Sequence, residues 1–323
     1  MSKEELAAEY AIRVRLCFAR CVGVPGLVRQ DDRVKAGEAF GAAVEAAYRG
    51  GLAVDGAWVL RVGENGVVVL PAAGALARVI RDQEQLPHVE HEMAVAQWLA
   101  SVAVPTAVPL LPSPTLVDGY VVSFWEYLLD AASADLVTLA RCLKQLHAVS
   151  PPDNGLLAQV DPFTRFDDRL VGGVTLSKED RAFLTEYREE LATQWERSSF
   201  ELGVSVVHGD AHMDNLLLTG EGRLAFVDLE TVAIGPPEWD LTLTALYYEC
   251  GWFSAGDYND FADAYGYDVR RSRAWPVLRG IRMLRMITWL AQSAGDHRDR
   301  EAQLRHRIAT LRDGTAPEGW TGF

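Results

Sequence analysis

Residues 208–215 read HGDAHMDN, and residues 226–228 read FVD. Asp210 precedes Asn215 by five residues and Asp228 by eighteen. Apolar residues flank both parts: valines precede the first, leucines follow it, and a second apolar run leads into FVD. Short apolar runs of this kind predict two buried strands that present polar side chains at their ends.

The side chains at these positions are typical of phosphoryl transfer. Asp210 would accept the proton of an attacking hydroxyl, while Asn215 and Asp228 would supply the oxygen ligands that Mg²⁺ prefers beside nucleotide phosphates. One alternative is a metallophosphatase site around Gly209–His212, but the further Asp-x-His and His pairs that it needs are missing from the sequence. Another is a capped turn between two core strands, which leaves the downstream FVD unexplained.

These motifs resemble a known enzyme family. HGDxxxxN followed by VDLE at residues 227–230 is similar to motifs of the aminoglycoside phosphotransferase and choline kinase group. GPPEWDL at 235–241 resembles the family's G-x-P-x-x-D-L segment, SFWEYL at 123–128 its hinge strand, and ARV at 77–79 the strand that carries a phosphate-binding cation. The resemblance extends over roughly residues 57–295.

The resemblance implies an α+β, two-lobed protein-kinase-like fold, with a small antiparallel-sheet N-lobe and a larger, mainly helical C-lobe. We expect an N-terminal helical extension at residues 1–50, an N-lobe with the nucleotide-binding sheet, one helix and the hinge at 51–128, and a C-lobe with the catalytic loop and acceptor site at 129–323. It also implies a small-molecule kinase that uses ATP and Mg²⁺, with Asp210 as the catalytic base.

Arg78, in the strand expected at 76–80, is the candidate cation for the phosphates. Protein kinases use Lys here, but Arg stays charged and can bind phosphate through two hydrogen bonds. Arg81 is the alternative, since a strand alternates its faces. Glu92 lies on or beside the apolar stripe of a helix expected at 88–101, where a carboxylate is costly without a cation. We therefore expect an Arg78–Glu92 ion pair like the kinase Lys–Glu pair; an exposed Glu92 is the alternative.

Three further groups of residues have expected roles. The resemblance places Trp125, Glu126 and Tyr127 at the hinge, where backbone groups would hydrogen-bond the adenine. It also makes Asp240 a brace of the catalytic loop. We expect His147 to be a helix C-terminal residue rather than a ligand.

The periodicity of the chain predicts its other elements. Helices are expected at 3–21, 36–48, 136–147, 177–198 and 278–287, a charged surface helix at 296–315, and strands at 58–62, 67–70, 76–80, 115–117 and 120–125.

The charge distribution bears on the acceptor. The chain has 45 acidic and 31 basic residues, a net charge of −14 that argues against nucleic acid as a partner. Residues 224–269 hold nine acids, no Lys or Arg, and interleaved aromatic residues. This pattern predicts an acidic, aromatic basin for a cationic acceptor, although solvated acids and core rings would give the same pattern. Glu230 and His212 are candidate substrate contacts.

The leading expectation for the function is therefore transfer of phosphate to an aminoglycoside-type antibiotic, as in antibiotic resistance. The alternatives are a choline or amino-alcohol kinase and a non-catalytic nucleotide-binding (pseudokinase) module. At 323 residues the chain can form two lobes, and no apolar run is long enough for a membrane span. A polar start and four scattered cysteines indicate a cytoplasmic protein with free thiols.

Overall fold

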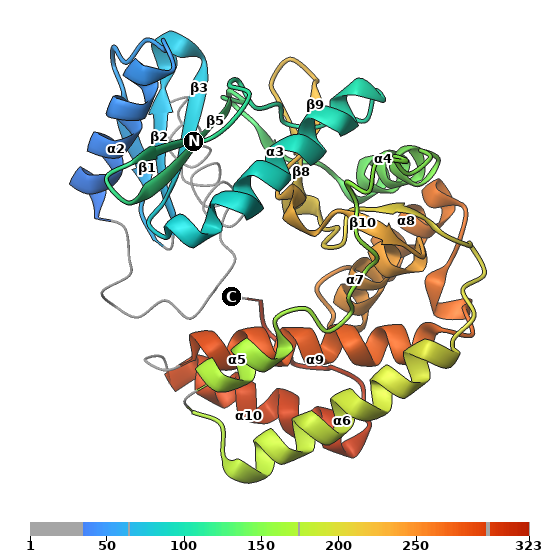
Figure 1. Ribbon diagram of the computed structural model, residues 1–323. Coiled ribbons are helices and arrows are strands. Elements are labelled where there is room, and N and C mark those ends of the chain that lie inside the picture. The colour runs from blue at the N-terminus through green and yellow to red at the C-terminus, as the bar shows by residue number, and fades with distance from the viewer. Residues whose placement is uncertain (1–34, 64, 174, 295–297, 323) are drawn as a thin grey trace, which may run out of the picture.

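The computed structural model describes residues 35–63, 65–173, 175–294 and 298–322. The helix expected at 3–21 lies outside these residues. The described chain forms a sheet-based N-lobe and a mainly helical C-lobe (Figure 1), which confirms the expected α+β architecture. None of the described helices is both long and apolar enough to cross a bilayer.

The N-lobe is an antiparallel sheet in the order β1-β2-β3-β5-β4. The expected strands are confirmed: β1 (Trp58–Arg61), β2 (Asn65–Leu70), β3 (Ala75–Ile80), β4 (Thr115–Val117) and β5 (Tyr120–Glu126). Because successive side chains on a strand point to opposite faces, the odd-numbered residues of β3 share one face and the even-numbered residues share the other. This alternation separates the apolar alanines of β3 from Arg78.

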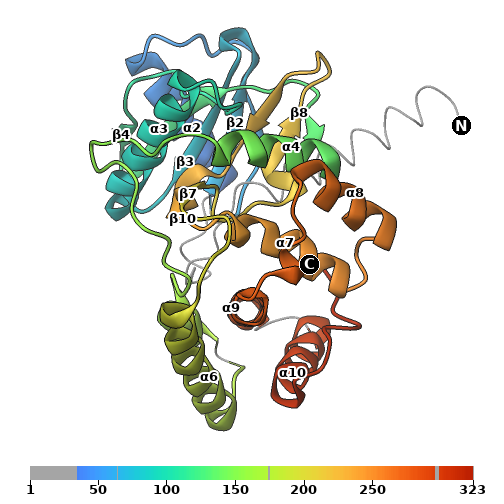
Figure 2. The same ribbon diagram turned by 90° about the vertical axis from the view of Figure 1, so that its right-hand side faces the viewer.

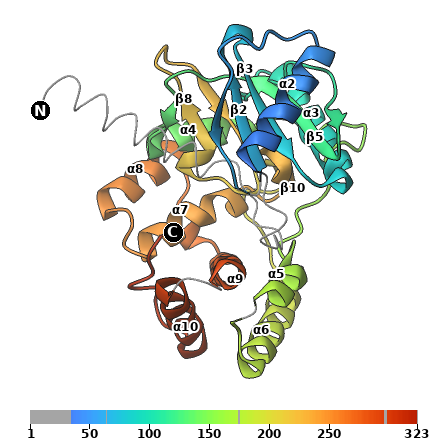
Figure 3. The same cartoon turned by 90° about the vertical axis from the view of Figure 1, so that its left-hand side faces the viewer.

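Helix α2 (Ala36–Arg49) covers one face of this sheet, as Figure 3 shows. Its buried side chains are all alanine, and small side chains let a helix lie close to the sheet. They pack on Ala75, Ala77, Val79 and other apolar residues of the sheet. The helix expected at 36–48 is thus confirmed, and it shares a core with the N-lobe sheet rather than standing apart from it.

Helix α3 (Leu86–Ser101) lies between the sheet and the C-lobe. Pro87, which lacks a backbone N–H, occupies its first turn, where no intrahelical partner is needed. Its apolar face buries Val89, Met93, Ala96 and Leu99 in the core that continues into the C-lobe.

The C-lobe consists of helices joined by two small sheets. Its helices are α4 (Leu136–His147), α5 (Phe166–Gly172), α6 (Lys178–Arg197), α7 (Glu238–Glu249), α8 (Ala255–Tyr265), α9 (Trp275–Ser293) and α10 (Arg298–Asp313). Its strands are β6 (Ala132–Ser133), β7 (Ser205–Val207), β8 (Leu216–Leu218), β9 (Leu224–Phe226) and β10 (Ala233–Gly235). The pair β10-β7 and the sheet β6-β8-β9 hold the two ends of the HGDAHMDN segment at residues 208–215, which we call the catalytic motif.

Helix α9 is the centre of the lower part of the C-lobe, with α5, α6 and α10 around it (Figure 2). Its buried stripe includes Leu278, Ile281 and Leu284, as expected from its sequence. The charged helix expected at 296–315 forms as α10, but it is not only a surface helix. Leu304 and Ile308 are buried on its inner side, because α10 packs against α9.

Candidate active site

The catalytic motif turns sharply directly after β7, at Gly209. Its φ is +88°, and a Cβ built there would lie 2.1 Å from the carbonyl oxygen of Thr231. Any other residue would therefore collide with a neighbouring backbone. On the other side of the turn, the Thr231 hydroxyl donates to the His208 carbonyl at 3.0 Å. The glycine of HGD is thus dictated by the close approach of two loops.

Asp240, in the first turn of α7, holds this turn in place through hydrogen bonds. Its buried carboxylate accepts hydrogen bonds from the backbone N–H groups of His208 (2.6 Å) and Gly209 (2.8 Å). A third comes from Nε2 of His147 (3.0 Å), whose Nδ1 lies 2.8 Å from the Tyr265 hydroxyl. His147 does end α4, as expected, but it also belongs to this network, which links residues 93 positions apart in the chain.

We predict that Asp240→Asn destabilises the protein by about 2–3 kcal/mol at neutral pH, because an amide cannot accept all three hydrogen bonds of the carboxylate. Burial raises the pKa of Asp240, but the hydrogen bonds from His147 and from the backbone N–H of His208 outweigh this effect. The net pKa of Asp240 is therefore below its usual value. A depressed pKa gives stability that is present above about pH 4 and is lost as pH falls through the depressed value. Urea unfolding at pH 7 and pH 3 measures both effects: the difference between Asp240→Asn and wild type should shrink at the lower pH, and an equal difference would contradict the carboxylate's role.

Asp210 follows the turn and opens to solvent. Its side chain is 36% exposed, and its Oδ1 lies 3.4 Å from Nη1 of Arg282, a buried side chain of α9. Burial raises the pKa of Asp210, but His212, Arg282 and Arg285 outweigh it and hold the pKa below its usual value. Asp210 is therefore ionised at neutral pH, as an acceptor of protons must be. Arg282 also donates to the Gly209 carbonyl at 2.8 Å and so holds the loop from the α9 side.

Asn215 and Asp228 lie next to Asp210. The Asn215 amide donates to the Asp210 carbonyl at 2.9 Å, which leaves its Oδ1 buried with no hydrogen-bond partner among the described residues. Asp228 has left-handed backbone (φ 60°, ψ 59°), a conformation that Asp tolerates better than most residues. Burial raises the pKa of Asp228 well above its usual value, and the carboxylates of Glu230 and Glu92 add to this effect.

The side-chain oxygens of Asn215 and Asp228 could bind a cation that also binds phosphate. The oxygen of Asn215 has no hydrogen-bond partner among the described residues, and burial with the neighbouring carboxylates outweighs the effect of Arg78 on Asp228. Within the described ranges, no group of three His, Cys, Asp or Glu side chains could hold a metal by itself.

Arg78 and Glu92 form a buried ion pair beneath the N-lobe sheet. Nη1 of Arg78 lies 2.8 Å and 3.0 Å from the two carboxylate oxygens of Glu92. Desolvation lowers the pKa of Arg78, but the nearby carboxylates of Glu92, Glu230 and Asp228 outweigh this effect. The net pKa of Arg78 is raised above its usual value, so Arg78 stays charged. Arg81, the alternative, is exposed at the end of β3, on the α2 side where Glu38 and Tyr120 lie. The alternation of the strand thus turns Arg78, and not Arg81, toward the C-lobe.

A cavity lies between the lobes, and we call it the interlobe cavity. It is lined by Leu76, Arg78, Glu92, Ala107, Trp125, Glu126, Leu128, Leu217, Val227, Asp228 and Leu229. Of the hinge residues, Trp125 and Glu126 line it. Tyr127 does not; its backbone N–H donates to the Gly74 carbonyl at 2.8 Å. Leu128, at the end of the expected hinge, also lines the cavity, whereas the sequence does not predict the apolar contributions of Leu76, Ala107 and Leu217, because residues so far apart in the chain share no motif.

The Glu126 carboxylate already has partners within the protein. It pairs with Arg223 and accepts a hydrogen bond from the Val108 backbone N–H at 2.9 Å. Arg223 precedes β9, so this ion pair joins the hinge strand to the C-lobe. The backbone N–H of Glu126 is engaged as well, since it donates to the Val108 carbonyl at 3.0 Å.

A second, larger cavity opens beside Asp210, and we call it the C-lobe cavity. It has a volume of about 650 Å³, large enough for a drug-sized molecule. Its polar and charged lining comprises Asp210, His212, Asp214, Asn215, Asp228, Arg169, Arg282, Arg285, Arg300 and Arg307. Its aromatic lining comprises Tyr247, Trp252, Phe253 and Trp289. Asp228 lines both cavities, so it marks the place where they meet.

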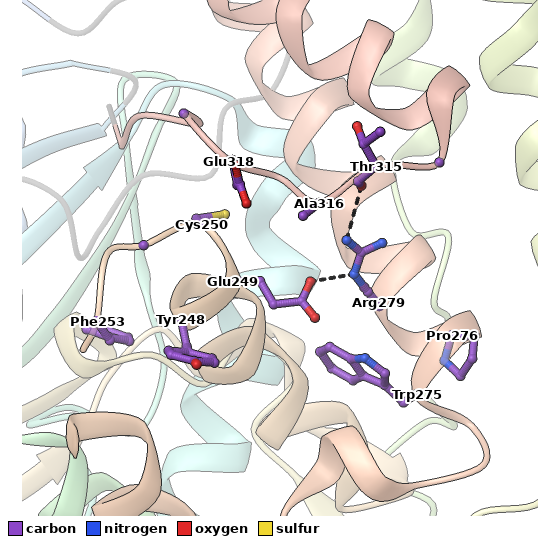
Figure 4. A pocket seen from close by; sticks show the side chains of 13 residues that line it. Tyr248, Glu249, Cys250, Phe253, Trp275, Pro276, Arg279, Thr315, Ala316 and Glu318 are labelled. Carbon is purple, nitrogen blue, oxygen red and sulfur yellow. Dashed lines mark hydrogen bonds and ion pairs between the residues drawn. The ribbon is translucent and has the colours of Figure 1, made fainter. Parts of the chain in front are cut away.

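The acidic basin expected over residues 224–269 is not what the structure forms. Of the nine acids, Asp228 alone is among the residues that line the C-lobe cavity. Glu249 pairs with Arg279 at 2.5 Å in a separate pocket between α7, α9 and the C-terminal segment (Figure 4), and Asp268 pairs with Arg270 at 3.1 Å. Glu238 and Asp240 are buried and accept backbone hydrogen bonds, while Asp257, Asp260 and Asp263 lie on exposed positions of α8.

The two candidate substrate contacts differ in position. His212 lines the C-lobe cavity, with its Nε2 3.9 Å from Asp210 Oδ2. Glu230 lines neither this cavity nor the interlobe cavity, and it lies 3.9 Å from Arg165. The structure therefore brings His212, but not Glu230, to the cavity beside Asp210.

Comparisons with known proteins concern the family and the fold. A sequence model of the phosphotransferase enzyme family matches residues 41–281. A search of curated proteins found no match. A microcompartment-associated aminopropanol kinase has a similar structure, with a TM-score of 0.60, 19% identity, and coverage of 83% of this chain and 94% of that one.

Two further solved structures are similar. An amicoumacin kinase in complex with AMP-PNP and Ca²⁺ has a TM-score of 0.60 and 13% identity, and covers 99% of this chain and 98% of its own. A choline kinase from Streptococcus pneumoniae has a TM-score of 0.54 and 16% identity, and covers 84% and 98%. At such identities the likeness shows a shared fold.

Proposed function

Since the chain belongs to the phosphotransferase enzyme family and is a small-molecule kinase, we propose that it transfers the γ-phosphate of ATP, with Mg²⁺, to a hydroxyl group of a small molecule bound beside Asp210. One observation carries this proposal. Asp228 lines both cavities, with the Arg78–Glu92 pair in the first and Asp210 in the second. A nucleotide in the interlobe cavity would therefore present its terminal phosphate to an acceptor in the C-lobe cavity.

The interlobe cavity suits a nucleotide. Leu76, Ala107 and Leu217 offer apolar surface to a base, and Trp125, Glu126 and Leu128 line the cavity on the hinge side. Arg78 lies deeper, where it would bind phosphate oxygens while Glu92 holds its guanidinium in place. Removal of Glu92 alone would leave Arg78 free to rotate away from the phosphates.

Asn215 Oδ1 and the Asp228 carboxylate would hold Mg²⁺. The Asn215 oxygen is buried without a hydrogen-bond partner among the described residues, and the pKa of Asp228 is raised by burial and by neighbouring carboxylates; these observations support the assignment. When bound, Mg²⁺ supplies charge neutralisation for the phosphate oxygens. Arg78 adds a second positive charge from the N-lobe side.

Asp210 acts on the acceptor. Its carboxylate accepts the proton of the acceptor hydroxyl as the hydroxyl oxygen forms a bond to the γ-phosphorus. The bond between the γ-phosphorus and the bridging β–γ oxygen breaks, its electron pair stays on that oxygen, and ADP leaves. The network of Asp240, Thr231 and Arg282 keeps Asp210 in place, so little reorganisation is needed during the reaction.

The identity of the acceptor is a separate matter. The sequence led us to expect a cationic acceptor such as an aminoglycoside-type antibiotic, with choline or an amino alcohol as the alternative. Apart from Asp228, the acids on which that expectation rested do not line the C-lobe cavity. Their positions give no support to an amine-binding basin.

The test of the function is transfer of radiolabelled γ-phosphate from ATP to a panel of hydroxyl compounds with amino, neutral and acidic groups, with and without Mg²⁺. We expect at least one acceptor to become labelled only with Mg²⁺ and ATP. A non-catalytic module would instead bind ATP in a thermal-shift assay and label nothing, and metal-dependent release of phosphate without ATP would favour a phosphatase. Either result would overturn the proposal.

We predict that Arg78→Ala raises the KM for ATP by roughly ten- to a hundredfold, since a charge-assisted hydrogen bond contributes about 1.5–3 kcal/mol. The loss also leaves Glu92 buried without its cation. Arg81→Ala, three residues away but exposed, is the matched control and should leave the KM nearly unchanged. Steady-state kinetics with varied ATP measures both, and equal effects of the two variants would count against Arg78 as the phosphate ligand.

A further inference from the structure

We propose that the acceptor carries an anionic group, a carboxylate or a phosphate, and that Arg169 and Arg285 bind it in the C-lobe cavity. This inference rests on the proposed function, because it concerns the second substrate of the same site. It reverses the sign of the acceptor charge that the sequence suggested.

The first observation is the number of cations around the cavity. Five arginines line it, from α5 (Arg169), α9 (Arg282 and Arg285) and α10 (Arg300 and Arg307), against the three carboxylates of Asp210, Asp214 and Asp228. Asp210 is assigned to the acceptor proton and Asp228 to Mg²⁺. The part of the cavity away from the catalytic loop is therefore positively charged.

The second observation is that two of these arginines have no hydrogen-bond or ion-pair partner among the described residues. Arg282 donates to the carbonyls of Gly209 and Trp239. Arg300 and Arg307 donate to backbone carbonyls at the far end of the cavity. Across the described ranges, by contrast, neither guanidinium of Arg169 and Arg285 has a hydrogen bond or an ion pair.

Burial makes this arrangement costly without a ligand. Arg169 is 9% exposed, and its Nε is buried without a partner in the described chain. Burial lowers the pKa of Arg285 to about 9, with the neighbouring Arg282 as the next cause, and burial likewise lowers the pKa of Arg169. An unpaired buried cation loses its hydration without compensation, and a carboxylate or phosphate is the planar or multivalent acceptor that guanidinium groups match best.

The positions of these arginines separate them from the nucleotide site. Arg169 and Arg285 line the C-lobe cavity and not the interlobe cavity, where Arg78 lies. Arg285 also sits three residues after Arg282 on α9, so both point to one side of the helix, and its guanidinium lies 5.5 Å from the Trp239 ring centroid. The aromatic wall of Trp252, Phe253 and Trp289 would pack on the body of an acceptor whose anionic group meets the arginines.

Matched probes test the sign of the charge. Both 4-(hydroxymethyl)benzoate and 4-(hydroxymethyl)benzylamine carry a benzylic alcohol on one ring and differ in the opposite group, and 4-(hydroxymethyl)phenylphosphonate distinguishes phosphate-like anions from carboxylates. Calorimetry measures their binding to the full chain with and without saturating Mg²⁺ and AMP-PNP. We expect at least one anionic probe to bind together with AMP-PNP, at least tenfold more tightly than the amine.

Variants then assign the residues. Arg285→Gln and Arg169→Gln should each weaken the anionic probe at least tenfold, while Arg285→Lys retains part of the affinity and the affinity for AMP-PNP stays unchanged. Arg305→Gln is the matched control, because it removes a charge from the exposed side of α10, where Arg305 pairs with Glu301. Circular dichroism checks that each variant is folded.

Several results would overturn the inference: tighter binding of the amine, equal binding of both classes, no binding of either anion, competition of the anion with AMP-PNP, or affinities that do not change in the two variants. Failure of the proposed function is distinguishable. In that case no acceptor would be labelled from ATP, whether or not AMP-PNP binds, whereas binding of the anionic probes is still measured without nucleotide.

Discussion

Asp210→Asn should lower kcat by roughly 10²- to 10⁴-fold, the contribution of a positioned general base, while the affinity for Mg²⁺·ATP stays within about twofold. An amide at this position keeps the size of the side chain but cannot accept the proton of the acceptor hydroxyl. The loop itself should remain in place, because Asp240, Thr231 and Arg282 hold the backbone of residues 208 and 209. The variant changes only the 3.4 Å contact between Arg282 and the side chain of residue 210. Single-turnover transfer and a separate nucleotide titration measure the two quantities.

Asp214→Asn is the matched control for this prediction. Asp214 lies in the same loop, its side chain is 30% exposed, and it accepts a hydrogen bond from the Ser133 hydroxyl at 2.6 Å. The charge change is the same, so any effect of cavity charge on ATP appears in both variants. Retention of more than a tenth of kcat in Asp210→Asn, or an equal loss in Asp214→Asn, would contradict the assignment of the base.

The local parts of this site could be predicted because each depends on a few consecutive residues. The alternation of β3 decides which arginine turns inward, and the structure places Arg78 rather than Arg81 against Glu92. The tight turn at Gly209 and the strands around the motif likewise follow from neighbouring residues. Such features are set by backbone geometry, which acts over short distances in the chain.

The acceptor side could not be predicted in the same way. A count of acids over residues 224–269 treats neighbours in sequence as neighbours in space, whereas Glu249 finds Arg279 on another helix and Asp240 is sealed beneath the loop. The arginines of the C-lobe cavity come from three helices whose packing the sequence does not reveal. One signal was present: Arg282 interrupts the apolar stripe of α9, and a cation in such a stripe indicates a buried polar site.

The same contrast applies to His147 and Asp240. Each residue has an adequate local explanation, as a helix C-terminal residue and as an acid in the first turn of a helix. Their hydrogen bond joins α4 to α7 and becomes visible only when both helices are packed against the loop. A residue with an adequate local explanation can therefore also have a long-range role that the sequence does not reveal.

Asp228→Asn should weaken Mg²⁺-dependent ATP binding by roughly a hundredfold, because one charged ligand of the cation is lost. The change preserves the left-handed backbone, which Asn also adopts readily. Burial raises the pKa of Asp228 well above its usual value, and Glu230, Glu92 and Asp210 lie near it. In the folded protein without ligand, the charged Asp228 is therefore unfavourable because of burial and repulsion by these carboxylates. Removal of its charge should not destabilise the fold.

The pH dependence follows from the sign of that shift. A carboxylate whose pKa is raised in the folded state binds its proton more tightly there than in the unfolded chain, so the stability of the ligand-free wild type falls as pH rises above about 4 through the raised pKa. Asp228→Asn should lack this fall and melt roughly 2–4 °C higher at neutral pH, although Mg²⁺ and ATP should raise its melting temperature far less than that of the wild type. Asp118→Asn, another left-handed Asp on an exposed turn, is the matched control and should change neither quantity. A structural role for Asp228 would show the opposite: a lower melting temperature without ligand, with the Mg²⁺·ATP response intact.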